Sequence, residues 1–217
     1  MRQLLNINKR ILAKKSLGQN FIYNEDFLKK LSTKISSNLS TDIIEIGPGT
    51  GSLTNHLISK KFKNLILIEK DTELSNALHK KFKNEKNIRV YNKDALTFDF
   101  SNISKNKETI IVGNLPFNIS SQLLIKWISY NKWPPFYSKM YLMFQKELGK
   151  RINSEISSKS YGKLSVLTQS RCDVKELITA PSHIFKPRPK VDGIVLELTL
   201  IETYIDVDLK KLTRILK

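Results

Sequence analysis

The sequence contains a single cysteine and no long uninterrupted run of apolar residues. With Cys172 alone, no disulfide can form within the chain and no cysteine cluster can hold a metal. No apolar stretch approaches the roughly 20 residues that a membrane-spanning helix needs. We therefore expect a cytoplasmic protein in a reducing compartment, with neither a metal centre nor a membrane anchor.

Acidic residues are also scarce, because 20 Asp and Glu stand against 37 Lys and Arg and leave a formal net charge of +17. Such a surplus is typical of proteins that bind polyanions, and nucleic acid is the first candidate. Most of the basic residues are lysine, so compositional bias is an alternative explanation. The basic stretch from Arg2 to Lys15 is compatible with a mitochondrial presequence, but residues 16–21 are more typical of a functional loop.

Glycine is sparse, yet Gly47, Gly49 and Gly51 fall close together. The apolar run Ile43–Ile46 before them predicts a buried parallel strand, and the amphipathic stretch from Ser52 predicts a helix. A strand, a glycine loop and a helix open a nucleotide-binding βαβ unit. The G-x-G-x-G spacing and the missing amide at Pro48 favour a small adenosine-type ligand over a pyrophosphate, although these glycines alone also fit a structural turn.

The rest of the chain alternates between strand and helix patterns. Further strands are predicted over residues 64–69, 88–91, 109–112 and 140–144, with a closing antiparallel pair over 174–179 and 191–200. Helices are predicted after Asn24, Ser52, Asp71 and Ser120, and over residues 147–157 and 161–172. This alternation predicts an α/β fold with a doubly wound, mostly parallel sheet.

Two carboxylates follow predicted strands of this sheet. Glu69 ends the second strand, where an acid can accept hydrogen bonds from ribose hydroxyls, and Asp94 follows the third, where it can accept from an adenine amino group. Each alone could be an ordinary capping or turn residue. Ligands collect at the carboxyl ends of strands in open α/β sheets, so the two acids and the glycine loop together predict a binding pocket.

The stretch Asn114-Leu115-Pro116-Phe117 follows the fourth strand and predicts a catalytic turn. Pro116 holds Leu115 extended, so the turn can aim carbonyl oxygens outward. Acceptors from the Asn114 side chain and the Leu115 backbone could hold the N–H groups of an exocyclic base amine and point its lone pair at an electrophilic methyl group. Phe117 could stack on the base. In isolation, a β-turn with a core Phe is the alternative.

These stretches together resemble a known family, the ribosomal RNA small-subunit adenine dimethyltransferases of the KsgA type. The resemblance runs from about Asn8 to Ile201. The stretches that carry it are Leu17-Gly-Gln-Asn-Phe21, Glu45-Ile-Gly-Pro-Gly-Thr-Gly51, Glu69, Asp94, Gly113-Asn-Leu-Pro-Phe-Asn-Ile-Ser120, Gln145-Lys-Glu147, Tyr161-Gly-Lys-Leu-Ser165 and Phe185-Lys-Pro-Arg-Pro-Lys-Val-Asp192.

The resemblance implies a seven-stranded Rossmann-like methyltransferase sheet with helices on both faces and S-adenosyl-L-methionine as the cofactor. The implied reaction dimethylates N6 of two adjacent adenines near the 3′ end of small-subunit (16S) rRNA, with a role in ribosome biogenesis. The implied partner is small-subunit rRNA in a ribosomal particle. We expect the protein to act as a monomer without a metal.

The resemblance also implies roles for single residues. The implied cofactor-binding residues are Asn20, Ile22, Gly47, Glu69, Asp94 and Asn114. Asn20 and Ile22 would line the methionine side of the cofactor, and Asn114 the region around the methyl group. Phe185 would face Phe117 across an extruded adenine. From the local excess of basic residues, we expect Lys186, Arg188 and Lys190 to hold the RNA backbone.

Two departures from the family pattern stand out. Phe117 takes a position where Tyr is common, which removes a hydroxyl and keeps the stacking face. The family usually carries a small helical domain after the sheet, and this chain ends at Lys217. We therefore expect a methyltransferase domain over residues 1–203 and the start of a truncated helical domain over 204–217.

Three other functions remain as alternatives. The first is the related large-subunit rRNA methyltransferase that confers macrolide resistance, against which Asn114-Leu-Pro and the stretch 185–192 argue. The second is a non-catalytic RNA-binding or ribosome-assembly factor on the same fold, against which the intact Glu69, Asp94 and Asn114 argue. The third is a nicotinamide dehydrogenase, which the glycine spacing disfavours.

Overall fold

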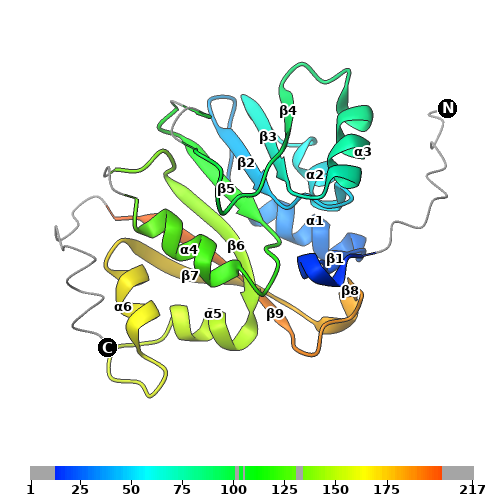
Figure 1. Ribbon diagram of the computed structural model, residues 1–217. Coiled ribbons are helices and arrows are strands. Elements are labelled where there is room, and N and C mark those ends of the chain that lie inside the picture. Colours follow the sequence, from blue (N-terminus) through cyan, green and yellow to red (C-terminus); the bar gives the residue numbers. More distant parts are fainter. Residues whose placement is uncertain (1–12, 101–102, 105, 131–133, 202–217) are drawn as a thin grey trace.

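Helices cover both faces of a central sheet in the computed structural model, which describes residues 13–100, 103–104, 106–130 and 134–201 (Figure 1). The strands are β1 (Phe21–Ile22), β2 (Asp42–Ile46), β3 (Asn64–Glu69), β4 (Ile88–Asn92), β5 (Thr109–Gly113), β6 (Lys139–Gln145), β7 (Cys172–Ala180), β8 (Phe185–Lys186) and β9 (Gly193–Leu200). The helices are α1 (Glu25–Lys34), α2 (Ser52–Leu57), α3 (Thr72–Phe82), α4 (Ser120–Ile128), α5 (Lys146–Ile152) and α6 (Lys163–Gln169), with short 3-10 helices η1 (Lys15–Leu17) and η2 (Ser182–Ile184).

The main sheet has seven strands in the order β4-β3-β2-β5-β6-β9-β7. The first five strands of this order run parallel to one another, and β9 runs antiparallel to both β6 and β7. The mostly parallel seven-stranded sheet is therefore confirmed. Because β2 pairs with both β3 and β5, the strand order reverses beside β2, and ligands bind at such a switch point in open α/β sheets.

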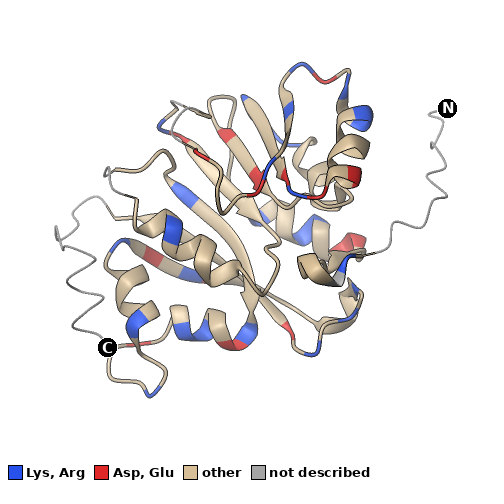
Figure 2. Ribbon diagram, viewed as in Figure 1, with Lys and Arg blue, Asp and Glu red and all other residues tan. Residues whose placement is uncertain are grey.

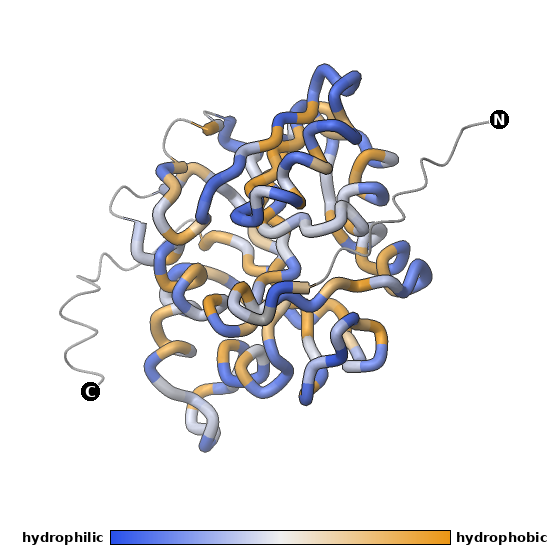
Figure 3. Tube along the Cα trace, turned by 45° about the vertical axis from the view of Figure 1, so that its right-hand side comes forward, coloured by the Kyte–Doolittle hydropathy of each residue, from blue (hydrophilic) through white to orange (hydrophobic). Residues whose placement is uncertain are grey.

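Alternate residues of the central strands pack into two hydrophobic cores. Ile44 and Ile66 point to the core that contains residues of α4, α5 and α6. Their neighbours Ile43 and Leu65 point to the core that contains residues of α1, α2 and α3. Charged residues lie mainly on the helices and loops (Figure 2), and the central strands are largely hydrophobic (Figure 3). Helices on both faces are thus confirmed, and they leave the strand ends to build the site.

Side-chain caps start two of the helices where the sequence predicts them. The Asn24 side chain accepts a hydrogen bond from Phe27 N at 2.8 Å and begins α1. The Asp71 side chain accepts from Glu73 N at 2.9 Å and begins α3. Such caps satisfy amides that have no partner within the helix. The cap at Asp71 also fixes the chain directly after Glu69.

Two predicted helices are too long. The helix predicted over 147–157 is α5, which ends at Ile152, and the helix predicted over 161–172 is α6, which ends at Gln169. Gln169 Nε2 donates to the carbonyls of Ile152 and Ser154 at 3.0 and 2.9 Å. These contacts satisfy carbonyls after α5 without further helix, and Cys172 already belongs to β7. The predicted strands differ from the observed ones by at most two residues at either end.

A second, two-stranded sheet joins distant parts of the sequence. Phe21 of β1 pairs with Lys186 of β8, and Ile22 pairs with Phe185. Tyr23 N continues the contact by donating to Ile184 O at 3.2 Å. The pairing places the segment before α1 beside the segment after β7. The domain predicted over 204–217 lies outside the described residues and stays a prediction.

Candidate active site

One pocket opens at the carboxyl ends of the parallel strands and is lined by all six residues predicted to bind the cofactor. These residues are Asn20, Ile22, Gly47, Glu69, Asp94 and Asn114. They come from the segment before α1 and from the ends of β2, β3, β4 and β5. The structure brings them together, and their roles in binding stay predictions.

The glycine loop after β2 has a backbone that only glycine adopts without strain. Gly47, Gly49 and Gly51 have φ values of +64°, +59° and +78°. A Cβ on Gly49 would lie 2.9 Å from carbons of the Phe21 ring. The loop therefore packs tightly against β1, and Gly47, Pro48, Gly49 and Thr50 line the pocket.

Glu69 is a nearly buried carboxylate at the end of β3. Its Oε2 accepts from Gly49 N at 3.0 Å, and its Oε1 accepts from Asp71 N at 2.8 Å. Burial raises the pKa of Glu69, against the hydrogen bonds from the Asp71 and Gly49 amides. Because each carboxylate oxygen has a second lone pair, Glu69 can still accept bonds from two hydroxyl groups of a ligand.

Asp94 lies in the turn after β4. Its Oδ2 pairs with Lys70 Nζ at 2.7 Å, and its Oδ1 accepts from Leu96 N at 2.9 Å. Burial alone would raise the pKa of Asp94, but the hydrogen bonds from Lys70 and Leu96 bring it below its ordinary value. The carboxylate is thus ionised and oriented at neutral pH, as an acceptor for a base amino group should be.

Lys126 of α4 binds the same turn through its ammonium group. No sequence pattern predicted this role for Lys126. Its Nζ donates to the carbonyls of Ala95, Leu96 and Phe98 at 3.0, 2.8 and 2.8 Å. A lysine on an amphipathic helix carries no sequence signal for this role, because the carbonyls it binds are about 30 residues away.

The predicted catalytic turn follows β5, and its amide is oriented by the segment before α1. Asn114 Nδ2 donates to Asn20 O at 2.9 Å. Among the described residues Asn114 Oδ1 makes no hydrogen bond, and Asn114 lines the pocket together with Leu115, Pro116 and Phe117. Asn114 can therefore present an acceptor to a donor that enters the pocket.

The two predicted stacking residues touch each other. The Phe117 and Phe185 rings have centroids 6.3 Å apart and planes at 65°, an edge-to-face contact. Phe117 lines the pocket, whereas Phe185 is 2% exposed and belongs to the core beneath it. A base between the two rings would require them to separate, so in this conformation Phe117 alone offers a face beside the pocket.

Glu45 is a third acid in the pocket, beside Glu69 and Asp94, and the sequence alone indicated no role for it. It lies within β2, is buried, and accepts a hydrogen bond from Thr54 Oγ1 at 2.7 Å. Burial raises the pKa of Glu45 to about 7, against this hydrogen bond. The signal that could have found it is an acid inside an otherwise apolar strand that leads into a glycine loop.

Of the three predicted RNA-backbone residues, Lys186 ends β8 of the short sheet, and Arg188 and Lys190 follow it. All three are exposed. Arg188 Nε donates to Ser182 Oγ at 3.1 Å, and Lys186 Nζ lies 5.7 Å from the centroid of the Tyr23 ring. Of the basic stretch predicted beside them, Arg2 to residue 12 lie outside the described residues.

Two kinds of site have no candidate in the described part of the chain. Its His, Cys, Asp and Glu residues form no group of three or more that could hold a metal ion. None of its helices combines the length and the hydropathy of a membrane span.

Comparisons with the sequences and structures of known proteins agree with one another. A profile of the family described as ribosomal RNA adenine dimethylase matches residues 10–217. The ribosomal RNA small subunit methyltransferase A of Pelagibacter ubique is 40% identical over 212 residues, which cover 94% of this chain and 78% of the relative. Its namesake from Coxiella burnetii is 38% identical over 190 residues, covering 88% and 72%. A crystal structure of a dimethyladenosine transferase from Plasmodium falciparum superposes with a TM-score of 0.80 at 28% identity, covering 90% of this chain and 69% of that one.

Proposed function

The chain belongs to the ribosomal RNA adenine dimethylase family, and from that membership we propose that it dimethylates N6 of two adjacent adenines near the 3′ end of 16S rRNA. The methyl donor is S-adenosyl-L-methionine. The substrate is small-subunit rRNA in a ribosomal particle, and the reaction belongs to ribosome biogenesis. We further propose that the protein acts in the cytoplasm as a monomer without a metal.

The residues around the pocket fit this cofactor. The loop at Gly47 has no side chain, and a Cβ there would meet Asn114 O and Pro116 Cδ only at 4.0 Å, so a ligand can approach the backbone. Glu69 suits ribose hydroxyls, and the ionised Asp94 suits an adenine amino group. When bound, S-adenosylmethionine supplies an electrophilic methyl group. Asn20 and Ile22 would hold its methionine side.

The observation that carries the proposed function is the orientation of the Asn114 amide. Because Nδ2 donates to Asn20 O, Oδ1 is the atom that can receive an N–H from the target amine. The lone pair of an adenine amine is delocalised into the ring, so the amine is a poor nucleophile. An acceptor fixed in advance favours rehybridisation of that nitrogen, and such preorganised contacts are a large source of catalysis. No general base is assigned, since the proton can leave after the methyl arrives.

The base must leave its stack to reach this acceptor. Extrusion costs a few kcal/mol, and stacking on an aromatic side chain returns roughly 1–3 kcal/mol. We propose that Phe117 provides the first face and that Phe185 provides the second when the edge-to-face contact opens. Lys186, Arg188 and Lys190 would then hold phosphates beside the extruded base.

Methyl transfer to defined ribosomal particles tests the proposal. Small subunits that lack the modification are incubated with the protein and labelled S-adenosylmethionine, and the modified bases are mapped, with large subunits as the matched control. We expect label on two adjacent adenines of 16S rRNA and none on large subunits. Label on one adenine of the large subunit would instead support the macrolide-resistance activity. No transfer to either particle, with RNA binding intact, would support a non-catalytic assembly factor.

A further inference from the structure

Residues 13–22, here called the N-terminal arm, form one wall of the pocket. Residues 16–22 of the arm line the pocket opposite the strand ends. The arm ends in β1, which pairs with β8, and Phe21 packs on the glycine loop. Gly18 fits against Asn118, because a Cβ on Gly18 would lie 2.5 Å from the Asn118 side-chain oxygen. These contacts hold the second half of the arm, and the first half needs another attachment.

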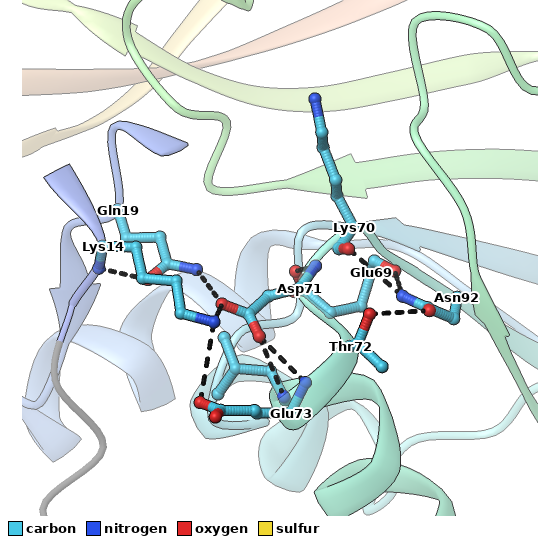
Figure 4. A network of polar contacts seen from close by, with 9 residues as sticks. Lys14, Gln19, Glu69, Lys70, Asp71, Thr72, Glu73 and Asn92 are labelled. Atoms are coloured by element: carbon cyan, nitrogen blue, oxygen red, sulfur yellow. Dashed lines mark hydrogen bonds and ion pairs between the residues drawn. The ribbon is translucent and has the colours of Figure 1, made fainter. Parts of the chain in front are cut away.

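That attachment is a set of polar contacts centred on the Asp71 carboxylate (Figure 4). Lys14 Nζ lies 2.9 Å from Asp71 Oδ2, and Gln19 Nε2 donates to the same oxygen at 3.3 Å. Lys14 N donates to Gln19 Oε1 at 2.8 Å, which ties the two arm residues together. Lys14 Nζ also lies 3.6 Å from Glu73 Oε2.

Asp71 divides its two oxygens between the arm and the helix. Oδ2 receives the arm, while Oδ1 accepts from Glu73 N and Leu74 N and begins α3. Burial alone would raise the pKa of Asp71, but the bonds from Lys14, the α3 amides and Gln19 bring it below its ordinary value. The carboxylate is therefore charged at neutral pH, as an ion pair with Lys14 requires.

The same residue connects the arm to the ligand-facing carboxylate. Asp71 N donates to Glu69 Oε1, and Glu69 Oε2 accepts from Gly49 N. A continuous run of contacts thus leads from the arm through Asp71 and Glu69 to the glycine loop. The Lys14 side chain is 44% exposed and the Asp71 side chain 2% exposed. The outer partner of the pair can therefore exchange its contact for water.

We propose that Lys14 and Gln19 are positioning residues that latch the N-terminal arm to Asp71 and so slow the release of the cofactor. The cofactor's identity rests on the proposed function. While the latch is closed, the wall that carries Asn20 and Ile22 stays against the ligand. When it opens, that wall loses its attachment to α3, and the ligand leaves faster.

The dissociation rate of S-adenosylmethionine tests the latch, measured by stopped flow at low salt. Lys14→Met removes the positive charge of the ion pair. Asp71→Asn removes the negative charge and keeps a residue that caps helices equally well. We expect each to speed dissociation roughly 2- to 5-fold, the range of a partly exposed ion pair. The double variant should be no faster than the quicker single one, because both single variants break the same ion pair between Lys14 and Asp71.

Two further variants separate the latch from general effects of charge. Lys14→Arg keeps the charge and should stay closer to wild type than Lys14→Met. Lys86→Met changes an exposed lysine in the turn before β4. This turn lies at the amino ends of the parallel strands, away from the pocket, so the rate should stay unchanged. Added salt should speed release from wild type and Lys86→Met more than from Lys14→Met. Single variants at the wild-type rate, or effects that add fully in the double variant, would overturn the latch.

Hydrogen exchange of the unliganded protein tests the latch without the cofactor. Amides of residues 16–22 should exchange faster in Lys14→Met than in wild type or Lys86→Met, while amides of β2 and β3 stay protected. If the arm exchanges alike in all three, the latch is wrong whatever the cofactor is. If the arm loosens as expected but S-adenosylmethionine does not bind wild type at all, the proposed function fails and the arm contact stands.

Discussion

At the scale of single residues, the side chain of Asn114 has two ends with different tasks. Its nitrogen is committed to Asn20 O, so replacement by alanine removes both the contact to the arm and the acceptor for substrate. We expect Asn114→Ala to fold, and to weaken cofactor binding much less than it slows methyl transfer. Methyl transfer should fall on the order of 100- to 1000-fold, by analogy with the removal of one preorganised oxyanion-hole donor. The measurement is kcat on unmodified small subunits.

Asn114→Asp is the matched variant, because it keeps the shape and places an acceptor where Nδ2 donates. An aspartate oxygen would face Asn20 O without a proton between them, so transfer should fall here too. Near-normal kcat in Asn114→Ala would show that the catalytic assignment is wrong.

The buried Glu45 makes stability depend on pH. Burial raises its pKa from 4.5 to about 7. Below pH 4.5 the Glu45 carboxyl is protonated in both the folded and the unfolded state. Between pH 4.5 and 7 it is ionised in the unfolded chain but still protonated in the folded protein. The free energy of unfolding should therefore fall as pH rises through this window, by at most about 3 kcal/mol from this group. Above pH 7 the contribution stays constant.

Urea unfolding between pH 4.5 and 7.5 measures this slope. Glu45→Gln should flatten it, since glutamine does not titrate and can still accept from Thr54. Glu85→Gln, an exposed change in the turn after α3, should keep the wild-type slope. Equal slopes in Glu45→Gln and wild type would contradict the assignment.

Residues at strand ends could be placed from the sequence, and residues that act across the fold could not. Glu69 and Asp94 follow apolar runs, so their position at the sheet edge follows from the strand pattern. Lys126 and Lys14 bind carbonyls and a carboxylate that belong to other elements, and nothing local distinguishes them from surface lysines. The contact between Phe117 and Phe185 likewise depends on how β8 docks, which no spacing encodes.

At the scale of elements, the turn over residues 94–98 depends on α4. Lys126 of that helix donates to three of its carbonyls. Burial lowers the pKa of Lys126, and the charged Asp94 and Asp99 act against this effect. Lys126→Met keeps most of the aliphatic stem and removes the ammonium group. We expect it to cost roughly 1.5–3 kcal/mol of unfolding free energy, the range for hydrogen bonds to charged groups, and to weaken cofactor binding several-fold.

Urea unfolding and calorimetry measure the two effects, and hydrogen exchange at Leu96 and Phe98 locates them. Gln122→Met, an exposed change one turn earlier on α4, is the control and should change neither quantity. Unchanged exchange in the turn of Lys126→Met would mean that Asp94 is held without α4.

The ends of the elements show where local patterns stop being informative. The clearest strand is β3, in which the polar residues Asn64 and Glu69 flank the apolar run Leu65–Ile68, and it was predicted with its observed ends. The two helices after β6 were predicted to run to residues 157 and 172, but they end at Ile152 and Gln169. The carbonyls at the end of α5 instead bind Gln169 and Ser165 from α6. Tertiary contacts of this kind override local propensity.

At the scale of the whole molecule, the alternation of strands and helices predicts the doubly wound sheet, but the short sheet of β1 and β8 could not be predicted. Its strands have two residues each, too few for any periodicity. Yet this sheet places Lys186 and the residues after it beside the arm and the pocket. It therefore decides which of the many lysines lie near the site.

The net charge of +17 alone does not identify an RNA-binding face. Basic residues are spread over α3, α4, α5 and α6 in Figure 2 and are not gathered on one element. Contacts with phosphates release counterions, so each one steepens the fall of affinity with salt. A face that holds RNA is therefore recognised by its effect on the salt dependence of binding.

The triple variant Lys186→Gln, Arg188→Gln, Lys190→Gln tests that face. Its binding to unmodified small-subunit RNA should depend less on salt, with the slope of log affinity against log salt reduced by roughly 0.7–0.9 for each phosphate that the variant no longer neutralises. The matched control is the triple variant Lys61→Gln, Lys83→Gln, Lys86→Gln. It removes the same charge before β3 and β4, at the amino ends of the strands. We expect the control to keep the wild-type slope, because its lysines lie across the sheet from the pocket. If both triple variants lower the slope equally, the surplus lysine acts as a diffuse field. If neither does, residues 186–190 do not carry the RNA.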